Sequence, residues 1–397
     1  MQHVRKKHTL KRIGNIFEKI YDYENLYASY LEARKGKRYR TEIMEFSANL
    51  DENLIELQNE LIWHTYKVGR YREFFVHDPK KRLIMALPFR DRIIQWAIYR
   101  QLDPLLEKRY INTSFGCRMK CAPIKGGPHS AVAKLQEYIR AQPGKAYILK
   151  MDISKYFYRV NHAIMMDLLR KTIKDEELLW LLGIIVNSEH DFGINIGDHD
   201  YCGERLHDVG MPIGNLSSQM LANFYLDGAD KFAKHELGAK YYLRYMDDMT
   251  IVSTDKKYLA ECRDAMYDFL LNERALLLNN KTSIRTETQG VDFCGFRIWR
   301  DHILLRKKTA LKMKHRLKGI VKRFARGKAN VEDFMKTYAS YNGQMRHCDS
   351  YRLRTKLLSS ICLQRKEVAG DEQKVNSGTD GDIDDDTVFL LCRNSAG

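Results

Sequence analysis

Two adjacent aspartates, Asp247 and Asp248, lie between two runs of apolar and aromatic residues in the stretch KYYLRYMDDMTIV. Neighbouring carboxylates repel each other and lose hydration where they are enclosed, so a proton or a cation must compensate them. A divalent metal ion is the natural compensation for such a pair. Two-metal phosphoryl transfer uses ions about 3.5–4 Å apart and needs at least three carboxylates, so a third acid must come from another part of the chain.

Asp152 is the best candidate for the third acid. It follows the apolar stretch AYILKM, residues 146–151, and opens the segment DISKYF. A side chain at the end of a strand leaves the sheet edge and reaches solvent. An aspartate in this position is by itself more often a helix cap or a turn residue. Because the chain also contains the Asp-Asp pair, we favour a metal-binding role for Asp152 over a cap or a turn. We predict one site that contains all three carboxylates.

The residues around the pair predict the element that holds it. Side chains of one face alternate along the sequence on both sides of the pair: Tyr241, Leu243, Tyr245, Met249 and Ile251. Such alternation indicates two strands joined by a tight turn, with one buried face. A plain turn would also explain two aspartates, because their side chains bond nearby backbone amides. With Asp152 taken into account, we expect a hairpin that carries Asp247 and Asp248 at its tip.

Two further segments could contact a nucleotide. Phe157, which follows Asp152 closely, could lie under the sugar of an incoming nucleotide, where a 2′-hydroxyl would clash; as a lone residue it would be core. The segment MPIGNLSSQMLANFYL contains Gly214, which permits close approach of the backbone, and continues into a helix. An ordinary loop that caps this helix through Ser217 or Ser218 explains the same residues.

The rest of the chain mixes helical and extended patterns. Helical spacing marks residues 11–70, 91–110, 162–170 and 176–188. Residues 71–88 predict a strand, a basic turn and a second strand, and residues 189–210 a loop with a short hairpin. From Thr309 a basic amphipathic helix and two further helical segments predict a separate small lobe. Its apolar stripe is Met313, Leu317, Ile320, Val321 and Phe324.

Length and charge narrow the possible classes of protein. The 397 residues can bury a large core and divide into two or three lobes. The formal net charge of +16 suits a phosphate-binding surface, although a ribosome-associated or membrane-surface protein would have a similar charge. Residues 366–397 differ from the rest, with eight acidic and three basic residues, and we expect this tail to be disordered or docked on a partner.

The sequence gives little support for a zinc site or a membrane segment. The eight cysteines include no CxxC pair and no paired histidine spacing. The basic start lacks the apolar core of a signal peptide, and no run of about 18 apolar residues occurs. We therefore expect a cytoplasmic protein with reduced thiols and no membrane partner.

Three segments together resemble a known family. DISKYF, MPIGNLSSQ and YMDD occur in the order and approximate separation found in reverse transcriptases, and the resemblance covers roughly residues 15–360. SFGCRMK resembles a block of the fingers, and VDFCGFRI resembles the primer grip. The family implies an α+β right-hand polymerase. Its parts would be N-terminal helices and fingers at 1–145, a palm with an antiparallel sheet plus helices at 146–300, a short helical thumb at 301–365 and the acidic tail at 366–397.

The resemblance also implies roles for single residues. Asp152 and Asp247 would bind two magnesium ions, for which manganese can substitute, with Asp248 completing the cluster and the backbone carbonyl of Ile153 as a further ligand. The other implied contacts are with the substrate: Lys80, Arg82 and Arg118 on the triphosphate, Phe157 as the sugar gate, Lys281 as the acid for the departing pyrophosphate, and Ile213, Gly214 and Gln219 in the loop before the catalytic hairpin.

The loop MPIGNLSSQ points to a subtype. Many relatives have Gln where this chain has Ile213 and Pro where it has Gln219, whereas the form seen here resembles enzymes of diversity-generating retroelements and their bacterial neighbours. Such an enzyme implies a template RNA, a nucleic-acid primer, deoxynucleoside triphosphates and a small basic accessory protein. Bacterial anti-phage defence and group II intron-like reverse transcriptases stay open. Two further alternatives are a catalytically silent RNA-binding protein and an RNA-directed RNA polymerase. The three aspartates argue against the first, and Phe157 argues against the second.

Overall fold

The computed structural model describes residues 11–77, 82–118, 126–188 and 208–365. Lys80, most of the expected loop at 189–210 and the acidic tail lie outside the described residues. The chain forms two compact units, one of residues 1–311 with 342–351 and one of 312–341 with 352–397. The expected fingers and palm fall within the first unit, so the boundaries at 145/146 and 300/301 stay a prediction.

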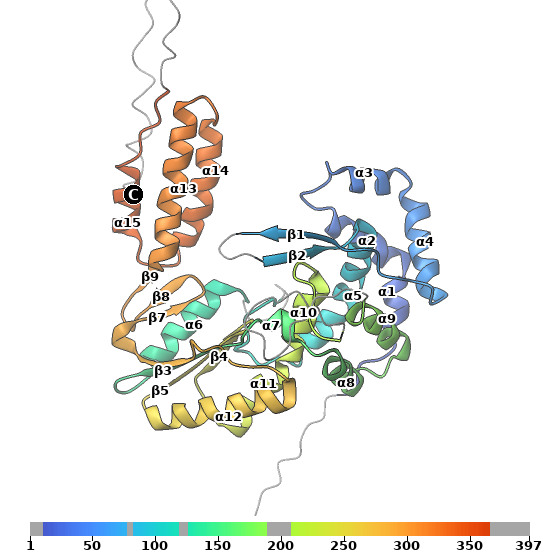
Figure 1. Ribbon diagram of the computed structural model, residues 1–397, viewed down its shortest axis with the longest axis horizontal. Helices are drawn as coiled ribbons and strands as arrows, with labels where there is room; N and C mark the ends of the chain where they lie inside the picture. The colour runs from blue at the N-terminus through green and yellow to red at the C-terminus, as the bar shows by residue number, and fades with distance from the viewer. Residues whose placement is uncertain (1–10, 78–81, 119–125, 189–207, 366–397) are drawn as a thin grey trace, which may run out of the picture. The chain divides into compact units, whose positions relative to one another are not determined.

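A four-stranded antiparallel sheet forms the centre of the first unit (Figure 1). Its strands in spatial order are β4 (Tyr242–Tyr245), β5 (Asp248–Ser253), β3 (Tyr147–Asp152) and β6 (Ser283–Thr286). Leu149, Met151, Met249 and Ile251 project from one face into the main hydrophobic core. Helices α10 (Leu216–Tyr225), α11 (Asp227–Lys231) and α12 (Lys256–Arg274), with the π-helical turn η1 (Phe232–Glu236), contribute to this core.

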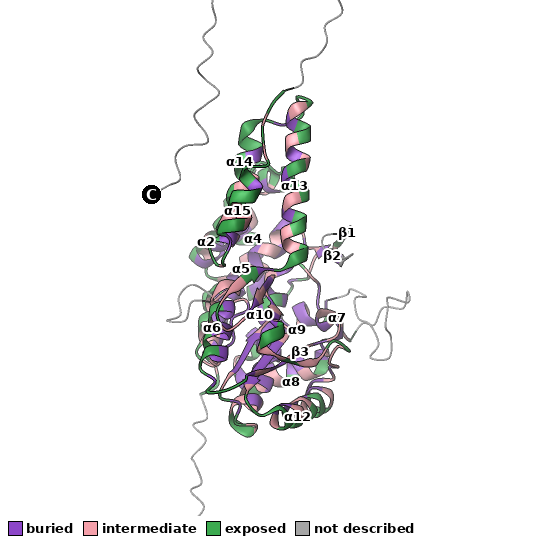
Figure 2. Ribbon diagram, turned by 90° about the vertical axis from the view of Figure 1, so that its left-hand side faces the viewer, coloured by how far each residue is buried: buried purple, intermediate pink, exposed green. Residues whose placement is uncertain are grey.

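The opposite face of the sheet is covered as well. Helix α6 (Pro128–Arg140) packs against β4 and against a three-stranded sheet of β7 (Val291–Phe293), β8 (Phe296–Ile298) and β9 (Ile303–Leu305). The 3₁₀ turn η2 (Glu287–Gln289) joins β6 to β7. Coverage from both sides explains why β4 and β5 are continuously buried in their middle parts (Figure 2).

The N-terminal helices and a hairpin complete the first unit. α1 (Phe17–Tyr21), α2 (Tyr23–Ala33) and α3 (Thr41–Ala48) pack against α5 (Phe89–Glu107), and α4 (Leu50–Ile62) packs against the first three helices. The hairpin consists of β1 (Arg72–Val76) and β2 (Arg82–Ala86), paired antiparallel. These elements confirm the helices and the two strands that periodicity predicts, while the basic turn expected between the strands lies at 78–81, outside the described residues. Every residue of β1 is exposed, whereas Leu83 and Met85 of β2 are buried.

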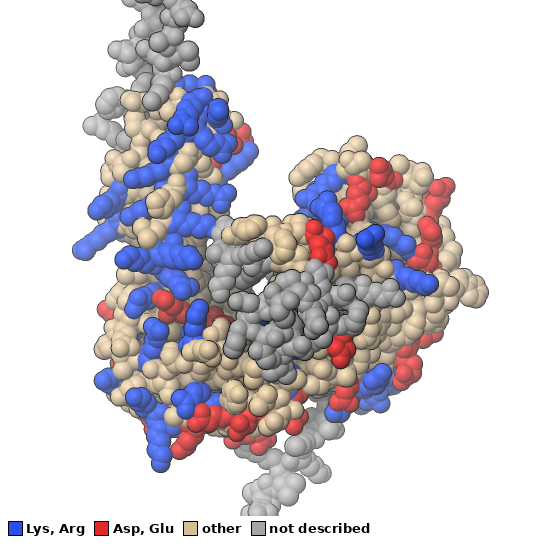
Figure 3. Space-filling view, in the orientation of Figure 1, with Lys and Arg blue, Asp and Glu red and all other residues tan. Residues whose placement is uncertain are grey.

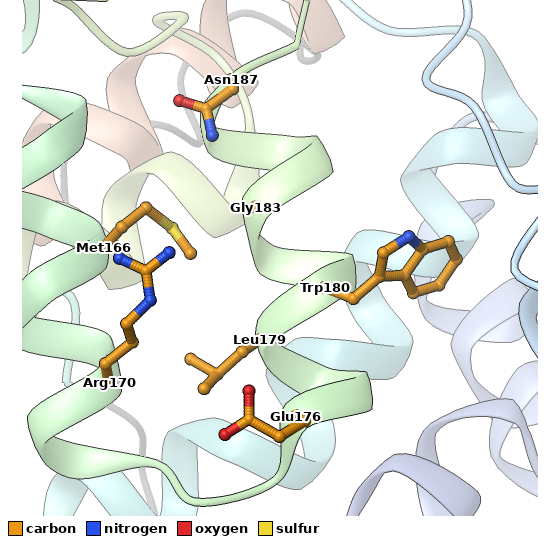
Figure 4. A pocket seen from close by; sticks show the side chains of 7 residues that line it. All are labelled: Met166, Arg170, Glu176, Leu179, Trp180, Gly183 and Asn187. Carbon is orange, nitrogen blue, oxygen red and sulfur yellow. The ribbon is translucent and has the colours of Figure 1, made fainter.

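Helices α7 (Tyr156–Arg159), α8 (His162–Thr172) and α9 (Glu176–Val186) follow β3. The Asp175 carboxylate caps α9 by accepting from Leu178 N at 3.2 Å and also accepts from Ile16 N at 2.8 Å, so it fixes α1 against α9. A hollow of about 330 Å³ lies between α8 and α9 and is lined by residues such as Arg170, Glu176 and Trp180 (Figure 4). It contains none of the residues singled out in the sequence.

The second unit consists of helices. Its described residues are α13 (Lys307–Ala325) from Lys312 on, α14 (Val331–Met345) as far as Tyr341, and α15 (Tyr351–Leu358) from Arg352 on, with their connections. Met313, Leu317, Ile320 and Phe324 form the buried stripe of α13, which confirms the predicted stripe except for the half-exposed Val321. Lys and Arg side chains gather along these helices on the face seen in Figure 3. No helix in the described ranges is both long and apolar enough to cross a membrane.

Candidate active site

The strand register brings the three predicted aspartates together. Asp152 of β3 lies opposite Asp248 of β5, and Tyr245 of β4 also lies opposite Asp248. Met246 and Asp247 therefore form the turn between β4 and β5. Ile153 N donates to Asp247 O at 3.4 Å, so the end of β3 touches this turn. Directly paired residues share a face of the sheet, and the Asp152 and Asp248 side chains hence leave the sheet on one side.

The predicted hairpin is confirmed, but its faces and its burial differ from the prediction. The two-residue turn pairs Leu243 with Thr250 and Arg244 with Met249, so Leu243 lies on the opposite face from Met249 and Ile251 and not on the same one. Tyr242, Leu243 and Arg244 are all buried, whereas alternation with one buried face was expected. The physical reason is that β4 has the core on one side and α6 on the other. Met246 has a φ of 55°, and Asp247 does not have a positive φ. A positive φ at only the first turn residue is typical of a type II′ hairpin turn, which costs strain without glycine.

Neighbouring backbone supports this strained turn. Phe115 N donates to Arg244 O and Arg244 N donates to Thr113 O, each at 2.9 Å, so the segment SFGC runs alongside β4. A Cβ atom at Gly116 would lie 2.6 Å from Met246 N. Only glycine therefore allows the segment to approach the turn this closely. Cys117 lies beyond it, with its Sγ 3.3 Å from Met246 Sδ.

Arg244 anchors the turn from inside the protein, and the sequence analysis did not identify it. Its Nη1 donates to Met246 O at 2.9 Å, while Nε and Nη2 donate to the two carboxylate oxygens of Asp230 at 2.7 and 2.6 Å. Both side chains are completely buried. Burial lowers the pKa of Arg244, but the Asp230 carboxylate outweighs it, and the net pKa is raised. An arginine within an apolar strand is the signal that could have revealed this anchor.

Two more missed residues contact the aspartates directly. Lys150 Nζ lies 3.0 Å from Asp248 Oδ1 and donates to the carbonyl oxygen of Asp292 at 2.8 Å. Asn279 Nδ2 donates to Asp152 Oδ2 at 3.3 Å, and Asn279 N donates to Asp152 O at 2.7 Å. Lys150 stands two residues before Asp152 in the same strand, so period-two alternation places both on one face. That spacing could have identified Lys150 from the sequence.

The turn between β7 and β8 lies close to the same group. Cys294 and Gly295 both have positive φ, as a type I′ hairpin turn requires. Burial raises the pKa of the Cys294 thiol to about 12, and the Asp248 carboxylate adds to the increase. The predicted primer-grip segment VDFCGFRI is thus next to the aspartates.

The donor set fits magnesium in type and charge. Carboxylate oxygens are hard ligands of the kind Mg²⁺ prefers, and three acids at neighbouring positions supply enough negative charge. Asp248 Oδ1 is enclosed and has the Lys150 ammonium as its charged neighbour. Among the described residues, however, no group of three His, Cys, Asp or Glu side chains stands in ligand geometry.

The loop MPIGNLSSQ lies against the fingers strand β2. Met85 N donates to Ile213 O at 3.3 Å, and the Ile213 side chain packs against Leu83 and Met85. Gly214 is exposed with a φ of 120°, and a Cβ atom there would lie 3.3 Å from Ile84 Cγ2. The glycine therefore permits both this backbone conformation and the close approach to β2.

Gln219 ends this segment, and Phe157 contacts its first residue. Gln219 on α10 is exposed, and the Cys117 thiol lies 3.5 Å from its Oε1. Cys117 also contacts Met246, so Gln219 is close to the turn at Met246 and Asp247. Phe157 on α7 is half-buried against the main core, and its carbonyl oxygen accepts from Met211 N at 2.6 Å. The hydrogen bond ties α7 to the start of the loop.

The structure supports none of the three predicted triphosphate contacts at the level of the side chain. Lys80 lies outside the described residues, and Arg82 is placed only by its backbone at the start of β2. The Arg118 side chain already has partners within the protein. Its guanidinium forms an ion pair with Glu107 at 2.5 Å and donates to the carbonyl oxygens of Ile111 and Ser114. The side chain is almost fully buried. We therefore withdraw Arg118 from the site. The protein encloses the Arg118 guanidinium, so this side chain has no exposed donor that could bind a phosphate.

Lys281 lies in the loop between α12 and β6. Its side chain is exposed, and its backbone N–H donates to Asn279 Oδ1 at 3.1 Å. Because Asn279 also contacts Asp152, this loop connects Lys281 to the carboxylates. An exposed ammonium in this position fits the expectation that Lys281 protonates the departing pyrophosphate from the solvent side.

Comparison with known proteins adds independent findings. A family model described as reverse transcriptase (RNA-dependent DNA polymerase) matches residues 77–298. Protein YkfC of Escherichia coli (strain K12) is 26% identical over 290 residues, which cover 64% of this chain and 73% of that protein. The group II intron-encoded protein LtrA of Lactococcus lactis subsp. cremoris is 23% identical over 244 residues, which cover 57% of this chain and 37% of LtrA.

Solved structures of telomerase also match. One, from Candida albicans in complex with a fragment of telomeric RNA, has a TM-score of 0.40 at 13% identity and covers 64% of this chain. Another, an apo form from Candida tropicalis truncated from the C-terminal domain, has a TM-score of 0.42 at 12% identity and covers 60%. This chain spans 51% and 55% of those two chains, and about a third of LtrA.

Proposed function

The chain belongs to the family of reverse transcriptases (RNA-dependent DNA polymerases), and from this premise we propose that it copies an RNA template into DNA by two-metal nucleotidyl transfer. Its fold is an α+β right-hand polymerase with fingers, palm and thumb. The observation that carries the proposal is the strand register, which sets Asp152 opposite Asp248 with Asp247 in the adjoining turn. A catalytically silent RNA-binding protein would not need three acids from two distant segments at one sheet edge.

Four residues would hold the metal ions. Asp152, Asp247 and the backbone carbonyl of Ile153 would ligate two Mg²⁺ ions, or Mn²⁺ as a substitute, and Asp248 would complete the acidic cluster. When bound, the ions neutralise the charge that develops on the reacting phosphate groups. The protein contributes position: strand pairing fixes Asp152 and Asp248, and the Arg244 hydrogen bond fixes the turn. Lys281 would protonate the departing pyrophosphate.

The substrate would be a deoxynucleoside triphosphate. Phe157 would exclude the 2′-hydroxyl of a ribonucleotide, and the loop with Ile213 and Gly214 would adjoin the nascent base pair. Lys80 and Arg82 of the β1–β2 hairpin would hold the triphosphate. The macromolecular partners would be a template RNA and a nucleic-acid primer. Their negative phosphates complement the formal net charge of +16.

For the biological role we propose error-prone synthesis in a diversity-generating retroelement, together with a small basic accessory protein. Its support is the form MPIGNLSSQ, with Ile213 and Gln219 at the positions that differ in many relatives. The similarity to LtrA favours a group II intron-like role as the second candidate. A near-duplicate repeat pair that differs at adenines in the neighbouring DNA would support the first, and intron sequence flanking the gene would support the second.

Primer extension on matched RNA and DNA templates tests the activity itself. We expect Mg²⁺-dependent synthesis on a primed homopolymeric RNA with deoxynucleotides. We expect little product with ribonucleotides, because Phe157 would exclude them. A folded chain that extends no primer on RNA under any metal condition would exclude the proposed function.

A further inference from the structure

The Lys150 side chain lies between the catalytic aspartates and the β7–β8 hairpin. Strand β3 places Lys150 opposite Thr250 of β5 and opposite Ser283 of β6, on the same face as Asp152. From this central position the ammonium reaches diagonally to Asp248 Oδ1 at 3.0 Å. It also donates to the carbonyl oxygen of Asp292 at 2.8 Å, and it lies 5.8 Å from the centre of the Phe293 ring. Both Asp292 and Phe293 belong to β7.

This arrangement encloses both charges. The side chains of Lys150 and Asp248 are 27% and 25% exposed, and Asp248 Oδ1 itself is shielded from solvent. An ammonium is a compact charge with three donors, which suits it to bond a carboxylate and a carbonyl at once. An uncharged side chain at position 150 would leave the enclosed oxygen without a compensating charge.

We propose that Lys150 is a positioning residue that holds Asp248 in place and ties the carboxylate cluster to the primer-grip hairpin. The proposal rests on the proposed function for the catalytic role of the cluster. Two consequences follow in opposite directions. Lys150 orients Asp248 and β7, which speeds the reaction. Its fixed positive charge also competes with divalent cations, so it weakens their binding.

The competition distinguishes Lys150 from a residue that only maintains the fold. A change that merely loosened the site would weaken both metal binding and turnover. Loss of the Lys150 charge should instead strengthen metal binding while turnover falls, because the cluster becomes one unit more negative as Asp248 loses its orientation. Lys150→Met removes the charge at similar length, and Lys150→Arg keeps it. Lys145→Met is the matched control, since it removes an exposed lysine just before the same strand.

Metal binding is measured with Mn²⁺ by electron paramagnetic resonance, without nucleotide or primer. We expect Lys150→Met to bind Mn²⁺ about three- to tenfold more tightly than the wild type, and Lys150→Arg and Lys145→Met to bind as the wild type does. Primer extension at saturating metal should fall at least about tenfold in Lys150→Met and stay unchanged in Lys145→Met. Unchanged or weaker Mn²⁺ binding by a folded Lys150→Met variant would overturn the proposal.

A metal-free experiment separates this proposal from the proposed function. In EDTA, thermal unfolding of Lys150→Met, Asp248→Asn and the double variant forms a double-mutant cycle. We expect the two changes to be non-additive, with the double variant more stable than the sum of the single changes predicts. Additive changes would contradict the pairing itself. A non-additive cycle in a chain that never extends a primer would leave the pairing intact and exclude only the polymerase function.

Discussion

At the scale of single residues, Asp152 and Asp248 have different neighbours. Asp248 faces the Lys150 ammonium at 3.0 Å, whereas Asp152 accepts a hydrogen bond from the Asn279 amide at 3.3 Å. An ammonium compensates a full charge, while an amide satisfies one lone pair. The charge and orientation of Asp248 therefore depend on Lys150.

Phe157 should control the choice between deoxyribonucleotides and ribonucleotides. Its ring lies on α7, close behind Asp152, and is only half-buried, so part of it remains available to a sugar. We predict that Phe157→Ala raises incorporation of ribonucleotides relative to deoxynucleotides at least about tenfold, because the clash with the 2′-hydroxyl is removed. The variant should lose about 2 kcal/mol of stability, since some core packing is lost.

The measurement is the ratio of incorporation efficiencies for the two nucleotide types on one template. Phe269→Ala serves as the matched control, because it removes a half-buried ring that stacks on Phe232 at 4.6 Å instead. An unchanged ratio in Phe157→Ala would assign Phe157 to the core alone.

Ile213 should contribute to errors opposite template adenine. An isoleucine fills volume without hydrogen bonds, so a misaligned base pair loses less relative to a correct one than it would beside a polar residue. We predict that Ile213→Gln lowers misincorporation opposite adenine more than opposite other bases. Ile213→Leu is the control that keeps the packing on Leu83 and Met85. Sequencing of products from one RNA template decides it, and an equal or higher adenine error rate in Ile213→Gln removes Ile213 from the explanation.

At the scale of elements, the catalytic hairpin depends on a buried ion pair. Arg244 connects the carbonyl of Met246 to both oxygens of Asp230, and Tyr242 donates to Asp230 Oδ1 at 2.7 Å. Removing the Asp230 charge would leave the guanidinium buried without a compensating carboxylate, which costs about 3–5 kcal/mol and risks unfolding the chain. Milder substitutions therefore test the anchor better.

We predict that Arg244→Lys keeps the fold but lowers the turnover number at least about tenfold, because an ammonium cannot bond both Asp230 and the turn in the same geometry. Tyr242→Phe, the control, removes one hydrogen bond to the same carboxylate and should cost about 1 kcal/mol with little loss of turnover. Chemical unfolding and single-turnover primer extension measure the two effects. Full turnover in a stable Arg244→Lys variant would show that the turn holds its shape without the arginine.

Much of the hairpin could be predicted from the sequence, and its supports could not. Alternation and the Asp-Asp pair predict two strands and a turn, and strand β3 follows from its apolar run. A period of two assigns residues to faces, but it does not say which strand lies beside which. The contacts of Lys150 with Asp248 and of Arg244 with Asp230 depend on that pairing. Arg118 was predicted to bind the triphosphate because the sequence does not show which charges are buried. In the structure its charge is enclosed and paired with Glu107.

At the scale of the whole molecule, the basic helices of the second unit should bind nucleic acid. Lys314, Lys318 and Lys322 lie off the buried stripe of α13. We predict that their replacement by alanine weakens binding to primed RNA and flattens its salt dependence, because each lost phosphate contact removes nearly one unit of log-log slope. Replacement of Lys19, Lys256 and Lys257, three exposed lysines of the first unit, is the control. An unchanged slope for the α13 variant would indicate a solvated helical surface.

The most direct test of the three-aspartate site is primer extension on an RNA template by Asp247→Ala. One ligand common to both metal ions is lost, so we predict a fall in activity of about a hundredfold or more, because removal of a central electrostatic element usually costs that much. The melting temperature should not fall, since a carboxylate next to Asp248 and Asp152 is removed and repulsion decreases. Asp264→Ala, an exposed aspartate on α12, should retain full activity. Activity of Asp247→Ala within about tenfold of the wild type would contradict the metal-binding role of this aspartate.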